Sequence, residues 1–182
     1  MNKKTLLIIF CALLSLLIIL FSYKTVLANT SLSANQQSTI DYLVNDEYLG
    51  LNYTTLEVDH LNDVKVVMNY ANIIFYILLI GLFIFIKYYL KQKEELKKLL
   101  YYGGLTTVIS LTIILFSTLL FFNQIFTLFH LIFFSQGNWT FAFNSLLITT
   151  FPIEFFMSFS FWTFLISLFV GLIIIYISKK MK

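Results

Sequence analysis

Four uninterrupted apolar runs constrain this chain more than any other feature of its sequence. They cover residues 5–22, 68–86, 105–122 and 161–177. At a rise of about 1.5 Å per residue, each run is roughly 25 to 29 Å long as a helix, close to the roughly 30 Å hydrocarbon core of a bilayer. The chain has 182 residues, of which 59% are hydrophobic and 12% charged, so an ordinary soluble domain is excluded. We therefore predict a membrane all-α fold with four transmembrane helices.

The lysines predict how these helices cross the membrane. Four spans place ten of the twelve basic residues, all of them lysines, on one side. These ten are Lys3, Lys4, Lys87, Lys91, Lys93, Lys97, Lys98, Lys179, Lys180 and Lys182. Lysine-rich short segments stay in the cytoplasm, so we expect both termini inside and a cytoplasmic loop at 87–103. Residues 29–65 and 123–160 are then the two outer segments.

The first run also has features of a cleaved signal peptide, because it has a basic start and residues 26–28 read VLA. We favour a retained helix, since 18 consecutive residues exceed a usual signal-peptide core and cleavage would leave three spans. A mature chain that starts at Asn29 would contradict this. The single cysteine, Cys11, lies in this run, which excludes an intrachain disulfide and a cysteine-based metal cluster.

The two outer segments differ in character. Residues 29–65 are polar and acidic, and they are too few to hold a core of their own, so they should form a small extracellular cap on the helix ends. Apolar pieces around Gly50 fit one or two short strands, or a strand and a helix. Residues 123–160 are rich in Phe and Trp and are interrupted at Gly137 and Pro152. We interpret them as an aromatic interfacial or re-entrant segment.

One of the two histidines lies directly before the second run. In a helix, His60 and Asp63 share a face, so the carboxylate could accept a hydrogen bond from one ring nitrogen and fix the tautomer. Asp59 and Glu57 are alternative partners. A polar stripe continues at spacings of three or four through Asn62, Lys65, Asn69, Asn72 and Tyr76. Such a stripe should face the bundle or a wet cavity, either for chemistry or to join helices.

The other histidine, His130, lies in the aromatic run at residues 126–134. Alone it would more often be structural, but the predicted topology puts both histidines at the outer face of the membrane. Two imidazoles there could act as general acid and base. No HExxH spacing supports a metal site, no nucleophile elbow or phosphate-binding loop is present, and the net charge of +3 comes from topology lysines rather than a nucleic-acid surface.

With those residues in view, the chain resembles the small bacterial membrane family that includes the lipoprotein intramolecular transacylase. The matching stretches are residues 59–65 (DHLNDVK), 129–134 (FHLIFF), 138–141 (NWTF) and 151–156 (FPIEFF). Their order and spacing and the predicted topology agree with the family over most of the chain. The resemblance implies a bacterial cell membrane protein of four transmembrane helices under an extracellular cap, with its active site facing outside.

The resemblance also implies a reaction. The family moves an acyl chain from the glyceryl sn-2 oxygen of a diacylglyceryl lipoprotein to the amine of its N-terminal cysteine. We expect no metal and no cofactor in this chain. Its two catalytic histidines correspond to His60 and His130. We expect supporting or substrate-positioning roles for Asp63, Asp59, Lys65, Asn69, Phe129, Phe133, Trp139 and Glu154. The partners are lipoproteins and membrane lipids, and the oligomeric state stays open. The alternatives are a non-enzymatic transport subunit or assembly factor, and a membrane acyl hydrolase.

Overall fold

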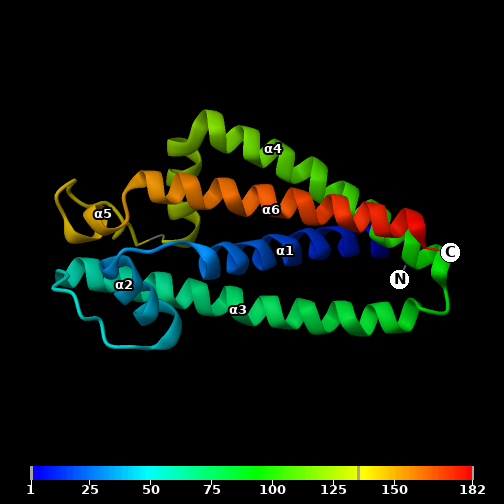
Figure 1. The fold of residues 1–182 in the computed structure, drawn as a ribbon, viewed down its shortest axis with the longest axis horizontal. Helices are drawn as coiled ribbons and strands as arrows, with labels where there is room; N and C mark the ends of the chain where they lie inside the picture. The colour runs from blue at the N-terminus through cyan, green and yellow to red at the C-terminus, as the bar shows by residue number, and fades with distance from the viewer. Residues whose placement is uncertain (1, 135, 182) are drawn as a thin grey trace.

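Helices account for nearly all of the ordered elements in the computed structural model, which describes residues 2–134 and 136–181. Four helices are long and apolar enough to cross a membrane: α1 (Lys3–Asn29), α3 (Thr55–Tyr89), α4 (Lys93–Phe133) and α6 (Ile153–Lys180). They lie side by side, with both termini at the end opposite the short helices α2 (Ala34–Asn45) and α5 (Leu146–Thr150) (Figure 1). The predicted fold of four membrane helices is confirmed.

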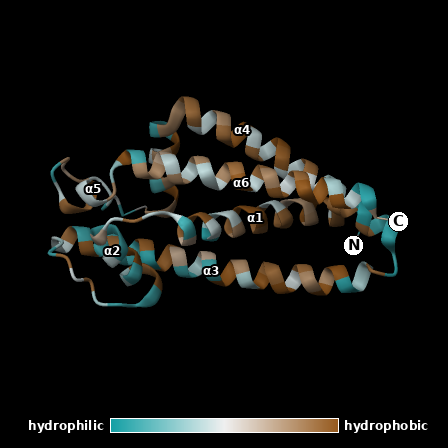
Figure 2. Cartoon of the chain, in the orientation of Figure 1, coloured by the Kyte–Doolittle hydropathy of each residue, from teal (hydrophilic) through white to brown (hydrophobic). Residues whose placement is uncertain are grey.

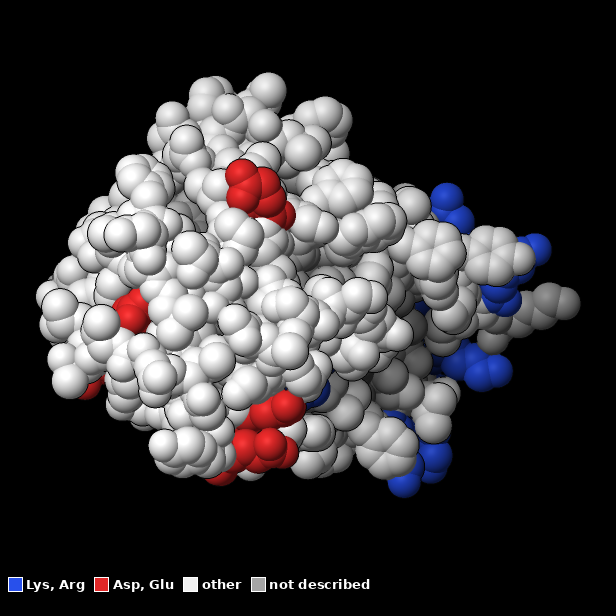
Figure 3. All heavy atoms as spheres, turned by 60° about the vertical axis from the view of Figure 1, so that its left-hand side comes forward, with Lys and Arg blue, Asp and Glu red and all other residues white. Residues whose placement is uncertain are grey.

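Hydropathy and charge follow the long axis of the bundle. Apolar residues fill the middle of the long helices, and hydrophilic residues gather at both ends (Figure 2). Most lysines on the face in Figure 3 lie at the end that carries the termini, and the acidic residues lie toward the cap. This is the charge asymmetry that a membrane protein uses to fix its orientation.

Helices α1, α4 and α6 form the tightly packed part of the bundle. A Cβ atom on Gly104 of α4 would lie 2.9 Å from the backbone oxygen of Gly171 in α6, so these two backbones are nearly in contact. Small residues allow this close approach in membrane bundles. The hydroxyl groups of Ser15 and Thr107 lie 2.9 Å apart and join α1 to α4. Near the end that carries the termini, one apolar cluster joins Phe10, Leu14, Ile18 and Leu99.

Helix α3 lies at the edge of this bundle, and beyond Leu61 the one buried residue of α3 is Phe75. Lys24 of α1 donates a 2.6 Å hydrogen bond to the side-chain oxygen of Asn72. Nearer the end that carries the termini, the rings of Phe10 and Phe85 stack with their centres 4.7 Å apart. The polar stripe therefore serves packing at Asn72, while Asn69 is exposed rather than directed at the bundle.

Helix α4 bends within its last third, because Phe121 has non-helical backbone angles of φ −134° and ψ 40°. Its last turns then reach α6, where the ring centres of Phe126 and Phe156 lie 5.4 Å apart. They also reach α3, where His130 faces His60. Residues 123–133 are thus helical, where the sequence suggested irregular backbone. Figure 1 shows this end of α4 turning back toward α1.

The cap differs from the expectation of strands, since the described residues contain none. Residues 34–45 form α2 instead, because a reciprocal pair of hydrogen bonds closes its first turn. The Ser33 hydroxyl accepts the backbone N–H of Gln36, and the side-chain oxygen of Gln36 accepts the backbone N–H of Ser33. This capping box stabilises the first turn of a helix. The segment around Gly50 has no second strand to pair with, and it is held through the hydroxyl of Tyr53, 2.8 Å from that of Thr39.

Candidate active site

The two histidines meet at the end of the bundle opposite the chain termini. His60 lies in the second turn of α3, and His130 lies near the end of α4 beyond the kink. Their ring centres are 6.1 Å apart and the ring planes differ by 24°. Both side chains are buried, with exposed fractions of 6% and 8%. The two rings are too far apart to hydrogen-bond to each other, yet one small reacting group could contact both.

The hydrogen bonds of the two imidazoles differ. Nδ1 of His130 lies 2.8 Å from the backbone oxygen of Phe126. A carbonyl oxygen can only accept, so Nδ1 donates and Nε2 of His130 is left available for substrate. Nδ1 of His60 is buried and has no hydrogen-bond partner in the described part of the chain. The helix α4 therefore orients one histidine through its own backbone, and the other keeps a free nitrogen.

The expected hydrogen bond between Asp63 and His60 is not present. The carboxylate of Asp63 instead accepts a 2.7 Å hydrogen bond from the side-chain amide of Asn138, in the loop after α4. The sequence motif correctly put Asp63 one turn beyond His60, but it could not show a partner that lies 75 residues away. Asp63 thus fixes the position of that loop rather than the tautomer of His60.

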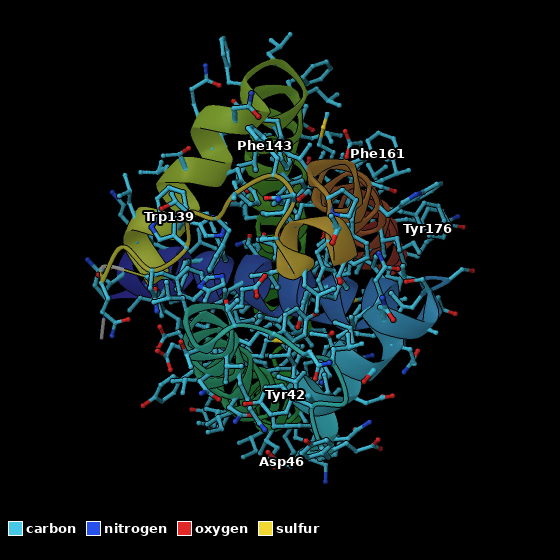
Figure 4. The ribbon with its side chains drawn as sticks, turned by 90° about the vertical axis from the view of Figure 1, so that its left-hand side faces the viewer. Tyr42, Asp46, Trp139, Phe143, Phe161 and Tyr176 are labelled. Carbon is cyan, nitrogen blue, oxygen red and sulfur yellow. The ribbon has the colours of Figure 1, made fainter. Side chains whose placement is uncertain are left out.

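Aromatic rings surround the histidine pair. The ring centre of Phe134 lies 4.8 Å from that of His60 and 5.4 Å from that of His130. Phe126 and Trp139 lie 4.2 and 4.9 Å from His130, measured between ring centres. Phe141 lies 5.6 Å from His60. Figure 4, which looks onto this end, shows Trp139 beside the end of α4 and the loop that follows it, away from Tyr42 of the cap. Such walls exclude water from reacting groups.

Two of the expected aromatic residues, Phe129 and Trp139, contact His130, since the Phe129 ring lies 5.6 Å from it. Phe133 contacts Phe129 and is half exposed, away from both histidines. Sequence reasoning missed Phe126, Phe134 and Phe141. Phe126 and Phe134 stand four residues before and after His130, a helical spacing that could have identified them.

The remaining predicted residues lie outside this cluster. Lys65 forms a 2.6 Å ion pair with Asp46, and its ammonium lies 4.2 Å from the ring centre of Tyr42, so it joins α3 to the cap. Asp59, Asn69 and Glu154 are exposed, the last in the first turn of α6. Within residues 2–134 and 136–181, no group of three or more His, Cys, Asp or Glu side chains is arranged to hold a metal ion.

A buried carboxylate, Glu57, joins the start of α3 to α5. Its exposed fraction is 2%. One carboxylate oxygen accepts the backbone N–H of Leu147 in α5 at 2.8 Å. The other accepts the backbone N–H and the hydroxyl of Thr54, both at 2.8 Å. The sequence suggested Glu57 only as a partner for His60, although Thr54 and Glu57 have the spacing of a capping box.

This fold and site define a class of protein: a multi-pass membrane protein with two facing, buried imidazoles at one end of its helices. The model of the family described as lipoprotein intramolecular transacylase Lit matches residues 6–156, and the chain belongs to that family. It is therefore an acyltransferase of lipoprotein biosynthesis. The matched residues include both histidines, Asp63 and Asn138. No curated protein matches the chain.

Solved structures of one membrane protein are similar to this chain. The lipoprotein intramolecular transacylase Lit from Bacillus cereus matches with a TM-score of 0.83 and 22% identity, over 97% of this chain and 94% of that chain. The variant of that protein with one histidine changed to arginine matches with a TM-score of 0.78 and 20% identity, over 97% of this chain and 90% of that chain. The variant with a histidine changed to alanine matches with a TM-score of 0.79 and 20% identity, over 98% of this chain and 93% of that chain. These similarities show the shared fold.

Proposed function

We propose that His60 and His130 together catalyse the intramolecular transfer of the sn-2 acyl chain of a diacylglyceryl lipoprotein to its N-terminal cysteine amine. The observation that carries this proposal is the pair of buried imidazoles, 6.1 Å apart between ring centres. The conversion of an ester to an amide needs a base for the amine and an acid for the departing oxygen, and two imidazoles supply both.

The hydrogen bonds favour one assignment of the roles. The free Nδ1 of His60 accepts a proton from the amine as its nitrogen bonds to the acyl carbonyl carbon. When Nε2 of His130 also carries a proton, that proton passes to the glyceryl oxygen as the ester C–O bond breaks. The bond to Phe126 is compatible with this role, because Nδ1 donates in both protonation states. One proton returning from His60 to His130 through solvent then restores the pair.

Enclosure supplies a further part of the proposed catalysis. Ester and amine belong to one substrate molecule, so they react once the substrate is folded to bring them together. Correct orientation can lower the barrier of such intramolecular steps by about 7 to 11 kcal/mol. The rings of Phe126, Phe134, Trp139 and Phe141 would confine the substrate against the histidines and keep out the water that would hydrolyse the ester.

The proposed reaction predicts a product with the mass of its substrate. The purified protein, supplied with a synthetic diacylglyceryl lipopeptide that has a free amine, should convert it to an isomer without any change in mass. Mass spectrometry with chromatographic separation measures this. Loss of one acyl chain would instead identify a hydrolase, and an unchanged lipopeptide would favour the non-enzymatic alternative.

We infer that the histidine pair and the cap face outside and that both termini are cytoplasmic, which follows from the lysines at the opposite end. In a Cys11→Ser background, Phe143→Cys should react in intact cells with a thiol reagent that cannot cross the membrane, because Phe143 is 96% exposed at the cap end. Lys180→Cys should react only after the cells are opened. The reverse pattern would contradict the orientation.

A further inference from the structure

One lysine in the cap-side half of the bundle has no acidic partner in the described part of the chain. Lys24 is half-buried on α1, five residues before the end of that helix. The ion pairs among the described residues join Lys65 to Asp46 and Lys3 to Glu95, and neither includes Lys24. An unpaired charge beside the apolar core of a bilayer is costly, so it indicates a functional contact.

Neighbouring groups on α3 orient the Lys24 ammonium. It donates a 2.6 Å hydrogen bond to Oδ1 of Asn72, which joins α1 to the adjacent α3 (Figure 1). It also lies 5.5 Å from the ring centre of Phe75 and 5.6 Å from that of Tyr76. A neutral amide and two aromatic rings hold an ammonium in place, but they do not supply a negative charge to balance it. The contacts of Lys24 therefore leave room for an anion.

A second polar side chain on α3 lies beside the lipid. Asn69 stands three residues before Asn72, so the two share one face of the helix. Asn69 is exposed, although it lies within the apolar run at 68–86. An amide at this depth costs free energy unless a polar group satisfies it. Lys24 and Asn69 thus place N–H donors on the same side of α3, next to the surrounding membrane.

The surface of α3 that continues from Asn69 toward the middle of the bilayer is apolar. It carries Ile73, Ile77 and Ile80, which are 55%, 63% and 59% exposed. Spacings of four, four and three residues from Asn69 keep these side chains on one strip of the helix, here called the isoleucine strip. N–H donors at one end of an apolar strip have the layout that a phospholipid needs, with its headgroup at the donors and its chains along the strip.

We propose that Lys24 and Asn69 bind the headgroup phosphate of an anionic phospholipid whose acyl chains lie along the isoleucine strip. The ammonium balances the negative charge, and both side chains donate hydrogen bonds to the phosphate oxygens. A zwitterionic headgroup fits less well, because its own cation would lie near Lys24 without an acid to pair with. The bound lipid reinforces the contact between α1 and α3, the helix that carries His60.

This site is separate from the histidine pair and does not depend on the proposed reaction. Asn72, the partner of Lys24, lies twelve residues beyond His60, which is roughly 18 Å along a helix. The polar stripe on α3 therefore has two parts. Its beginning joins the cap through Lys65 and Asp46, and its continuation at Asn69 and Asn72 belongs to the lipid site.

Quenching of a single tryptophan by brominated lipids tests the site in the full-length protein. Trp139 and Trp162 are replaced by Phe, and Ile73→Trp provides the reporter. Nanodiscs contain phosphatidylglycerol and phosphatidylcholine, with the bromine on one lipid and then on the other. Phosphatidylglycerol should be preferred beside the reporter by at least about fivefold, the effect expected of one basic residue on an anionic lipid. Equal quenching by the two lipids overturns the proposal.

Substitutions then assign the preference to the named residues. Lys24→Gln should bring it close to one, whereas Lys24→Arg should keep most of it, because arginine retains the charge and the donors. Asn69→Leu should lower it by about half or more. Lys4→Gln, at the opposite end of α1, should leave it unchanged. A preference that survives Lys24→Gln contradicts the site.

Two further measurements separate a site from other effects. A reporter at Leu120→Trp, a 72% exposed position on α4, should show little preference. A preference there as large as at residue 73 would mean general enrichment of anionic lipid and would overturn the site. Thermal unfolding checks the fold of each variant. If Lys24→Gln does not fold, Asn69→Leu decides, because its side chain is exposed, and an undiminished preference in that variant contradicts the proposal.

Discussion

Replacing either histidine, as His60→Ala or His130→Ala, should lower the rate of lipopeptide rearrangement by about 10² to 10⁴, the usual contribution of a positioned acid or base. Each ring serves a different proton transfer in one reaction, so both variants should be affected. The double variant should lose little more than the worse single variant, because groups that act together are not additive. Rates are measured by mass spectrometry on purified protein in detergent.

A fold control belongs to this experiment, because both rings are buried among aromatic side chains. Thermal unfolding of each alanine variant should remain cooperative. A variant with near-normal rate would remove that histidine from the catalytic pair. If one variant kept its rate and the other lost it, the chemistry would depend on a single imidazole, and the assignment of acid and base given above would be wrong.

Replacing the buried carboxylate, as Glu57→Ala, should lower the free energy of unfolding by about 2 to 4 kcal/mol, because it leaves the N–H groups of Leu147 and Thr54 without their acceptor. The rate of acyl transfer should fall too, since the contact with α5 holds the loop that carries Trp139 and Phe141. Thermal and denaturant unfolding, with the rearrangement assay, measure both effects.

The matched variant is Glu57→Gln, which keeps one good acceptor oxygen and should lose about half as much stability. Glu47→Gln removes an exposed acid of the same cap and should change the free energy of unfolding by less than about 0.5 kcal/mol. If Glu57→Ala were as stable as Glu47→Gln, the carboxylate would not fix α5 to α3.

The membrane fold was predictable because its cause is local. An apolar run of 17 to 19 residues both predicts a transmembrane helix and is the physical reason that it forms. The lysines at the ends of these runs likewise predict the orientation of the helices and are its physical cause. The cap was less predictable. Its capping box at Ser33 and Gln36 is visible in the sequence, but the tyrosine-rich pieces around Gly50 favoured strands that have nothing to pair with.

The candidate site was predictable only in part. Family motifs predicted His60 and His130 as site residues. Their close approach in space depends on the bend at Phe121, and no proline or glycine near Phe121 indicates that bend in the sequence. The hydrogen-bond partner of Asp63 was not predictable either. The nearby His60 suggested the wrong partner, and the actual partner, Asn138, lies in a loop distant in sequence. Contacts between separate helices depend on the packing of the whole bundle, so a single sequence does not contain them as a readable pattern.

The most direct test of the account is a crossover measurement. Two diacyl lipopeptides, one with an isotope-labelled sn-2 acyl chain and a distinct peptide sequence, are incubated together with the protein. Tandem mass spectrometry then locates the label. We predict that it moves from the sn-2 oxygen to the cysteine amine of the same peptide and never to the other. Label on the unlabelled partner's peptide, or released as free fatty acid, would contradict intramolecular transfer at the histidine pair.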